Sequence, residues 1–225
     1  MTAISKQEVA ALPVEFKING KTVIGRADET IIQTAKQYGI EIPHLCYKEG
    51  YRPDGNCRAC VVEIKGERVL APSCCRYPKD GMEVVTDSER AVSAQKMVLE
   101  LLLSDQPETR YTLNSELDLW AKKLGVGEPR FPARQQPRAD LSHPAMSVNL
   151  DACIQCTRCV RACREEQVND VIGYAYRGEH SKIVFDLDDP MGASTCVACG
   201  ECVQACPTGA LMPARDVGLM EVDKK

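Results

Sequence analysis

The sequence predicts an α+β fold in two parts, a small mixed sheet packed on one helix and then a cysteine-rich part. Two short hairpins with a helical segment between them predict the sheet and its helix. A cysteine pattern at Cys153–Cys163 that recurs at Cys196–Cys206 predicts a duplicated unit with pseudo-twofold geometry. The 225 residues suffice for two such parts, each with a modest core.

The first hairpin has strands at 14–18 and 21–24, joined by Asn19-Gly20, the strongest two-residue turn signal. Asp28 is the expected cap of the helix that follows. The helix carries the apolar residues Ile31, Ile32, Ala35 and Tyr38 and is closed by Gly39. A long loop, 40–55, then contains Cys46.

The second hairpin has strands at 61–64 and 68–71 around Lys65-Gly66, and 82–86 is a last short strand. Asp87 or Ser88 caps a helix over 89–103. We expect a core-facing side on this helix made of Val92, Met97, Val98, Leu101 and Leu102.

A shorter helix, 116–124, follows Asn114-Ser115 and ends at Gly125. Trp120 in this helix is interpreted as a packing anchor rather than a site residue. The proline-rich stretch 127–144 predicts an extended surface connector. A hairpin of 171–176 and 182–185 is inserted in the cysteine repeat.

Composition excludes several classes of function. A net charge of −4 and 5% aromatic residues argue against nucleic-acid binding, and no apolar run is long enough to span a membrane. The N-terminal residues lack a secretory pattern, so we expect a cytoplasmic protein whose thiols stay reduced. Thirteen cysteines in such a compartment indicate metal ligation rather than disulfides.

The repeated motif reads Cys-x2-Cys-x2-Cys-x3-Cys in both copies and is the most specific signal in the chain. Three cysteines at this spacing wrap one [4Fe–4S] cluster, and the fourth reaches the other cluster. The spacing assigns the first cluster to Cys153, Cys156, Cys159 and Cys206, and the second to Cys196, Cys199, Cys202 and Cys163. Zinc also uses Cys-x2-Cys pairs, but a third cysteine at the same interval would be superfluous in both copies.

An earlier set consists of Cys46, Cys57, Cys60 and a cysteine at 74 or 75. Four thiolates suit a [2Fe–2S] cluster, with two on each iron. Zinc is the alternative, since only one Cys-x2-Cys pair is present. Adjacent residues in an extended segment point opposite ways, so one of Cys74 and Cys75 ligates and the other packs.

No pairing of a nucleophile with a base, no Gly-x-Gly-x-x-Gly and no P-loop occurs in the sequence. We therefore expect no catalytic residue and no substrate-converting site on this chain.

Four segments carry a resemblance to a known family: Ile42-Pro-His-Leu-Cys46, Gly55-Asn-Cys57-Arg-Ala-Cys60, Pro72-Ser-Cys74 leading to Gly81-Met82, and Cys199-Gly-Glu-Cys202-Val-Gln-Ala-Cys206-Pro. The chain resembles the N-terminal iron–sulfur region shared by the complex I large subunit, the diaphorase small subunit of NAD-reducing hydrogenases, and [FeFe] hydrogenases. It looks closest to the alpha subunit of NAD-dependent molybdenum or tungsten formate dehydrogenases. In this family the cysteine seven residues before Gly-Met is the ligand, which selects Cys74.

The resemblance implies a β-grasp [2Fe–2S] ferredoxin-like domain, then helices, then a bacterial-type 2[4Fe–4S] ferredoxin-like domain. The expected boundaries are an N-terminal tail 1–13, the [2Fe–2S] domain 14–87, a helical segment 88–125, a Pro-rich connector 126–147, the 2[4Fe–4S] domain 148–215 and a C-terminal tail 216–225.

One departure from the family concerns a third motif, His-x3-Cys-x2-Cys-x5-Cys, which usually follows the long helix. Gln106 stands where the histidine would be, and Arg110 and Leu113 stand where cysteines would be. No cysteine occurs between Cys75 and Cys153. We predict that this additional [4Fe–4S] cluster is absent.

The resemblance also implies function and partners: relay of electrons between a molybdopterin formate-oxidising unit and an FMN- and NAD-binding subunit. The chain is then either a separate relay subunit or part of a longer alpha subunit. The alternatives are the relay subunit of an NAD-reducing hydrogenase and, from another class, a zinc-stabilised structural protein.

Overall fold

The computed structural model describes residues 12–106, 111–112, 114–135 and 137–217. The chain divides into two compact units. The first unit holds the residues up to Ile42 together with Cys60–Val92, and the second holds Pro43–Ala59 and the chain from Ser93 onward. The loop that carries Cys46 and Cys57 is therefore part of the second unit, although it lies between two segments of the first in sequence.

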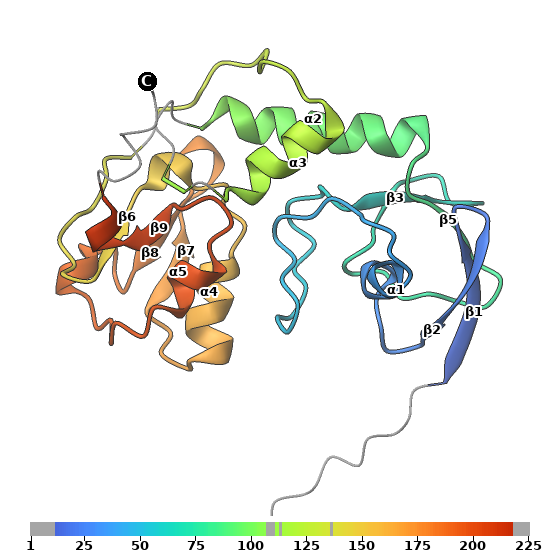
Figure 1. Ribbon diagram of the computed structural model, residues 1–225. Coiled ribbons are helices and arrows are strands. Elements are labelled where there is room, and N and C mark those ends of the chain that lie inside the picture. Colours follow the sequence, from blue (N-terminus) through green and yellow to red (C-terminus); the bar gives the residue numbers. More distant parts are fainter. Residues whose placement is uncertain (1–11, 107–110, 113, 136, 218–225) are drawn as a thin grey trace, which may run out of the picture. The chain divides into compact units, whose positions relative to one another are not determined.

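The first unit begins with the predicted hairpin, coloured blue in Figure 1. Strands β1 (Pro13–Ile18) and β2 (Lys21–Arg26) pair antiparallel along their whole length. Asn19 and Gly20 have φ of 50° and 80°, the left-handed pair that a tight turn between twisted strands requires. The side chain of Asn19 then exchanges two hydrogen bonds of 2.8 Å with Thr86, which ties the turn to the end of the last strand of this unit.

The sheet has five strands in the order β2-β1-β5-β3-β4, with β3 at Val61–Ile64, β4 at Ala71–Pro72 and β5 at Glu83–Val85. Strands β1 and β5 are parallel and the other pairs are antiparallel. The buried core between the sheet and helix α1 (Ile31–Gln37) includes Phe16, Ile18, Val23, Ile31 and Val84. The predicted mixed sheet on one helix is confirmed.

Two local details differ from the sequence prediction. Thr30, not Asp28, caps α1, because Arg26 holds the Asp28 carboxylate with two hydrogen bonds while the Gln33 side chain accepts from the Thr30 N–H at 2.8 Å. The second arm of the second hairpin is only Ala71–Pro72, because residues 65–70 form a longer turn in place of the predicted strand 68–71.

Helix α2 spans Glu89–Ser104 and begins as predicted, with the Ser88 hydroxyl accepting from the Ala91 N–H at 3.2 Å. Its predicted core face is partly wrong. Ala91, Gln95 and Leu99 are fully buried, while Met97 and Leu101 are 40% and 46% exposed. Val98 and Leu102 do pack against the buried cluster that contains Leu99.

Helix α3 spans Glu116–Leu124 with both predicted ends. The Ser115 hydroxyl accepts from the Asp118 N–H at 3.3 Å, and Gly125 closes the helix in a left-handed conformation. Trp120 is partly buried against the cluster of Leu45, Leu99 and Leu117, in agreement with a packing role.

The rest of the second unit has two small sheets, drawn in yellow to red in Figure 1. Strand β6 (Met146–Val148) pairs antiparallel with β9 (Leu211–Pro213), and β7 (Ile172–Ala175) pairs with β8 (Lys182–Phe185) as the predicted inserted hairpin. Short helices α4 (Arg158–Arg161) and α5 (Glu201–Ala205) occur at equivalent places in the two cysteine motifs. Cysteines are part of the buried core here, since Cys159, Cys163 and Cys202 lie among Met146, Leu150, Phe185 and Leu211.

Among the residues that the structure describes, no helix is both long enough and apolar enough to cross a membrane.

Candidate iron–sulfur sites

Cys46 and Cys57 lie together in the loop Pro43–Ala59. The Cys46 N–H donates to the Cys57 Sγ at 3.4 Å. A hydrogen bond with the Cys46 thiol, and then burial, raise the pKa of Cys57 well above its usual range. Metal binding requires the thiolate form of such a residue, and a bound iron would favour that form.

Cys60 and Cys74 lie in the first unit, at the start of β3 and just after β4. Ser73 joins the two segments, because its N–H and its hydroxyl both donate to the Cys60 carbonyl, at 3.1 and 2.8 Å. Both cysteines are buried. The assignment of Cys46, Cys57, Cys60 and Cys74 to one [2Fe–2S] cluster stays a prediction.

The expectation that Cys74 and Cys75 point opposite ways is wrong. Their Sγ atoms lie 3.6 Å apart, because the segment forms a turn, with the Cys75 N–H donating to the Pro72 carbonyl at 3.0 Å, rather than an extended strand. Cys74 is buried and Cys75 is half-buried.

The first predicted [4Fe–4S] set surrounds a small cavity. Its lining includes all four of Cys153, Cys156, Cys159 and Cys206. Burial raises the pKa of Cys153 to about 11, and the nearby Cys206 thiol adds to this effect. The pKa values of Cys156 and Cys159 are also raised, by burial first and then by the other thiols of the set.

The members of the second predicted set also influence one another. Burial raises the pKa of Cys202 to about 12, and the charges of Cys196, Cys199 and Cys163 contribute to the same rise. This set is more open than the first, since Cys199 is exposed and Cys196 is half-buried. The assignment of these eight cysteines to two [4Fe–4S] clusters, with one ligand of each supplied by the other motif, stays a prediction.

The two motifs share an unusual backbone. Gln155 and Thr157 flank Cys156 with φ of 54° and 60°, and Ala198 and Gly200 flank Cys199 with φ of 57° and 79°. Non-glycine residues in this left-handed region cost on the order of 1–3 kcal/mol each, which the surrounding structure must offset. The same conformation turns successive N–H groups toward one centre, as in anion-binding nests.

Backbone N–H groups also approach the sulfur atoms. Val171, Ala198 and Leu211 donate to the Sγ of Cys163, Cys196 and Cys206 at 3.3, 3.4 and 3.5 Å. Hydrogen bonds of this kind stabilise the extra negative charge of a reduced cluster and raise its potential. The donor chemistry of these loops therefore fits iron–sulfur clusters.

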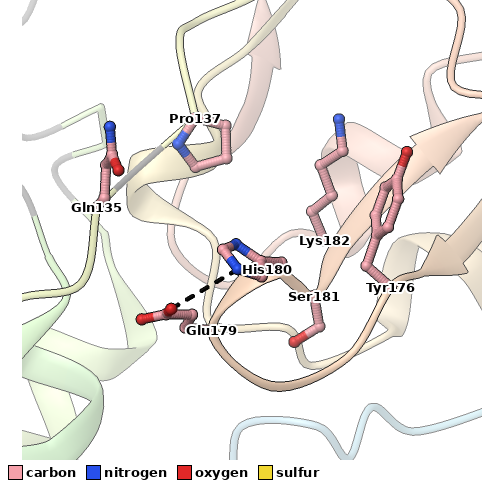
Figure 2. A pocket seen from close by; sticks show the side chains of 7 residues that line it. All are labelled: Gln135, Pro137, Tyr176, Glu179, His180, Ser181 and Lys182. Carbon is pink, nitrogen blue, oxygen red and sulfur yellow. Dashed lines mark ion pairs between the residues drawn. The ribbon is translucent and has the colours of Figure 1, made fainter.

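A single-ion site is not evident. Across residues 12–106, 111–112, 114–135 and 137–217, no three His, Cys, Asp or Glu side chains lie close enough to hold one metal ion. A surface cavity of about 510 Å³ lies apart from the cysteines (Figure 2) and contains no thiol. It is lined by polar side chains that include Glu179 and His180, whose Oε1 and Nε2 atoms are 3.6 Å apart.

Where the third motif of the family would lie, the Gln106 side chain donates to the Ala152 carbonyl at 3.4 Å. Arg110 and Leu113 lie outside the described residues. The absence of that additional cluster remains a prediction from the missing cysteines.

Sequence reasoning missed Arg158 and Arg161, which lie inside the first cysteine motif and are both buried. Arg158 reaches Glu116 and the Tyr47 carbonyl, and Arg161 reaches the carbonyls of Cys46 and Arg52. The two motifs differ at these positions, because Glu201 and Gln204 stand in the second copy where Arg158 and Arg161 stand in the first. This difference is the sequence signal that could have identified the two arginines.

Comparison with known families agrees with these sites. Residues 11–89 match the 2Fe-2S iron-sulfur cluster binding domain family, and residues 152–210 match the 4Fe-4S dicluster domain family. The chain is thus an iron–sulfur electron-transfer protein with one [2Fe–2S] domain and one two-cluster domain, as the sequence predicts.

Individual relatives narrow the class. The chain is 36% identical to the NADP-reducing hydrogenase subunit HndD of Solidesulfovibrio fructosivorans, over 87% of this chain and 35% of that protein. It is 33% identical to one subunit of an NADH-quinone oxidoreductase of Rhizobium meliloti, over 88% and 24% of the two chains. A putative formate dehydrogenase of Staphylococcus haemolyticus is 27% identical, over 87% and 20%.

A solved structure, that of an NAD+-reducing [NiFe]-hydrogenase in the H2-reduced state, matches with a TM-score of 0.82 and 27% identity, over 89% of this chain and 87% of that one. The chain therefore carries the iron–sulfur region that these hydrogenases, NADH-quinone oxidoreductases and formate dehydrogenases share, which confirms the predicted resemblance and fold class. It spans about a third or less of the length of these curated relatives.

Proposed function

We propose that this chain relays electrons in a cytoplasmic NAD-linked formate dehydrogenase, between a molybdopterin formate-oxidising unit and an FMN- and NAD-binding subunit. The observation that carries the relay is the composition of the second unit. One compact unit contains both the Cys46–Cys57 loop and all eight cysteines of the two-cluster domain. Two of the four predicted [2Fe–2S] ligands, Cys46 and Cys57, thus belong to the same packed unit as the two-cluster domain.

The predicted ligands would hold one [2Fe–2S] and two [4Fe–4S] clusters, which supply one-electron carriers when bound. The chain's own residues perform three tasks for such carriers. The thiols provide attachment, the apolar residues around Cys159 and Cys202 exclude water, and the N–H groups of Val171, Ala198 and Leu211 stabilise negative charge at sulfur. We propose no residue for substrate conversion on this chain.

A second candidate is the relay subunit of an NAD-reducing hydrogenase. Two observations favour it: the TM-score of 0.82 to a chain of an NAD+-reducing [NiFe]-hydrogenase, and the 36% identity to a subunit of an NADP-reducing hydrogenase. Under this proposal the partners are hydrogenase subunits, and the relay chemistry of this chain is unchanged.

Two measurements test these proposals. Iron and acid-labile sulfide content after anaerobic purification should be about ten of each per chain, with [2Fe–2S] and interacting [4Fe–4S] signals in EPR of the reduced protein. About fourteen irons would reveal an additional cluster. A colourless protein with zinc and no sulfide would support the structural alternative and end the relay proposal.

The electron donor is tested on the native complex. Formate should bleach the cluster absorption, and hydrogen should not, if the first proposal holds. The reverse response would replace it with the hydrogenase proposal.

A further inference from the structure

The guanidinium of Arg161 joins the two kinds of predicted cluster site. Its Nη2 donates to the carbonyl of Cys46 at 2.6 Å and to the carbonyl of Cys156 at 3.3 Å. Cys46 is a predicted [2Fe–2S] ligand and Cys156 a predicted ligand of the first [4Fe–4S] cluster. One buried group therefore bridges the main chains of two ligand residues that are far apart in sequence.

The other atoms of Arg161 fix it against the same loop. Nη1 donates to the Arg52 carbonyl at 2.5 Å, and Nε lies 3.2 Å from an oxygen of Asp54. The Arg161 side chain is only 3% exposed. Both Nη atoms therefore donate hydrogen bonds, while Nε makes none and is held by the charge of Asp54 alone. The planar fork of arginine reaches several acceptors in fixed directions, as a lysine cannot.

Neighbouring contacts hold the loop in the same place. The Thr157 hydroxyl donates to Asp54 at 2.6 Å and accepts from Asn56 at 3.2 Å. The side chains of Cys46 and Cys156 lie in one buried cluster with Ile154 and Leu99. Polar and apolar contacts therefore both hold the loop against the first cysteine motif.

We propose that Arg161 is a positioning residue that holds the [2Fe–2S] loop against the first [4Fe–4S] motif, so that one electron passes directly between these two sites. This inference rests on the proposed relay function and gives a route in a chain that lacks the third motif. The exchange takes one electron from one site and delivers it to the other, and it consumes no proton or co-reactant.

The test uses the full chain, purified anaerobically and reduced, with variants R161M and R161K. The readout is the microwave power that half-saturates the [2Fe–2S] EPR signal, because a nearby fast-relaxing [4Fe–4S] cluster raises that power. The matched control is R215M, since Arg215 is 87% exposed and pairs only with its neighbour Asp216 among the ion pairs described here.

We expect the half-saturation power to fall several-fold in R161M and by a smaller factor in R161K, with R215M equal to wild type and about ten irons in every chain. The midpoint potentials should shift negative in R161M alone, because only this variant removes the positive charge near both sites.

An unchanged half-saturation power in an iron-filled R161M would overturn the inference and leave the relay function standing. If R161M fails to bind iron, the R161K variant decides the question, because one ammonium cannot make the hydrogen bonds of the planar guanidinium. A half-saturation power equal to that of wild type in R161K would also overturn the inference. An iron content near zero in the wild-type chain would instead contradict the proposed relay function itself.

Discussion

Glu116 holds the buried guanidinium of Arg158 with both carboxylate oxygens, at 2.6 and 2.7 Å. Glu116 is the first residue of α3, and Arg158 lies in the first cysteine motif, where it also donates to the Tyr47 carbonyl at 2.5 Å. The pair therefore links helix α3, the motif and the Cys46 loop within one unit.

Replacing Glu116 with glutamine should destabilise the protein by about 1–3 kcal/mol. The Arg158 side chain is 4% exposed and would be left with an uncompensated charge, while Glu116 at 37% exposure limits the loss. The measurement is the apparent Tm at one fixed scan rate, because we expect melting that releases the clusters to be irreversible. Glu128→Gln, at an exposed position, is the control, and an equal Tm in both variants would contradict the role of the pair.

Cys74→Ser and Cys75→Ser form a matched pair that tests the [2Fe–2S] assignment. The first variant should lose the [2Fe–2S] signal and about two irons per chain, because a buried ligand is removed. The second should keep both. Since the two Sγ atoms are only 3.6 Å apart, the reverse result would move the ligand to Cys75 without moving the site.

Removal of iron should unfold the two units unequally. The core around β6 and β9 includes Cys159, Cys163 and Cys202, so the loss of clusters leaves thiols and voids among its apolar residues. The core of the first unit, with Phe16 and Val84 among its members, is mainly aliphatic and aromatic. Hydrogen exchange after chelation should therefore accelerate in β6 and β9 while β1 and β5 stay protected.

The control for that experiment is the holo-protein carried through the same buffers without chelator. Simultaneous loss of protection in both sheets would show that the first unit depends on the clusters as strongly as the second does.

Oxygen should attack the second [4Fe–4S] site before the first. Cys199 is exposed, whereas Cys156 and Cys159 are buried, and exposed sites are oxidised sooner. EPR after timed exposure to air should show one [4Fe–4S] component decaying first. In a Cys199→Ala chain this component should be weakened or missing from the start; a fast component that persists there would place the sensitive site elsewhere.

Local signals in the sequence predicted much of the fold. The Asn19-Gly20 turn, the Ser115 cap and the Gly125 stop each depend on residues within one turn of chain, and all three appear as expected. Features decided by distant contacts did not follow from the sequence. Asp28 lost the capping role because Arg26 engages it, and the buried face of α2 centres on Leu99 because the Cys46 loop packs there.

The site shows the same division. Cysteine spacing alone predicts two groups of four thiols, because three ligands of each group come from a single motif, and that grouping stays a prediction. The buried arginines escaped prediction because their partners, Cys46, Arg52 and Glu116, come from other segments that only the folded chain brings close.

The two cysteine motifs share left-handed residues and a short helix at equivalent positions but carry different side chains where they meet the loop. Thr157, Arg158 and Arg161 in the first copy correspond to Gly200, Glu201 and Gln204 in the second, where Glu201 accepts from Tyr51 and the Gln204 carbonyl accepts from Lys48. A two-cluster domain with exact twofold symmetry would offer the Cys46 loop two equivalent binding positions. Arg158 and Glu201 carry opposite charges at equivalent positions, and Arg161 corresponds to the neutral Gln204. The reversed arrangement would set Glu201 against the Tyr47 carbonyl oxygen that Arg158 now binds, which disfavours it. The duplicated scaffold therefore offers the loop one preferred binding position, beside the first cysteine motif.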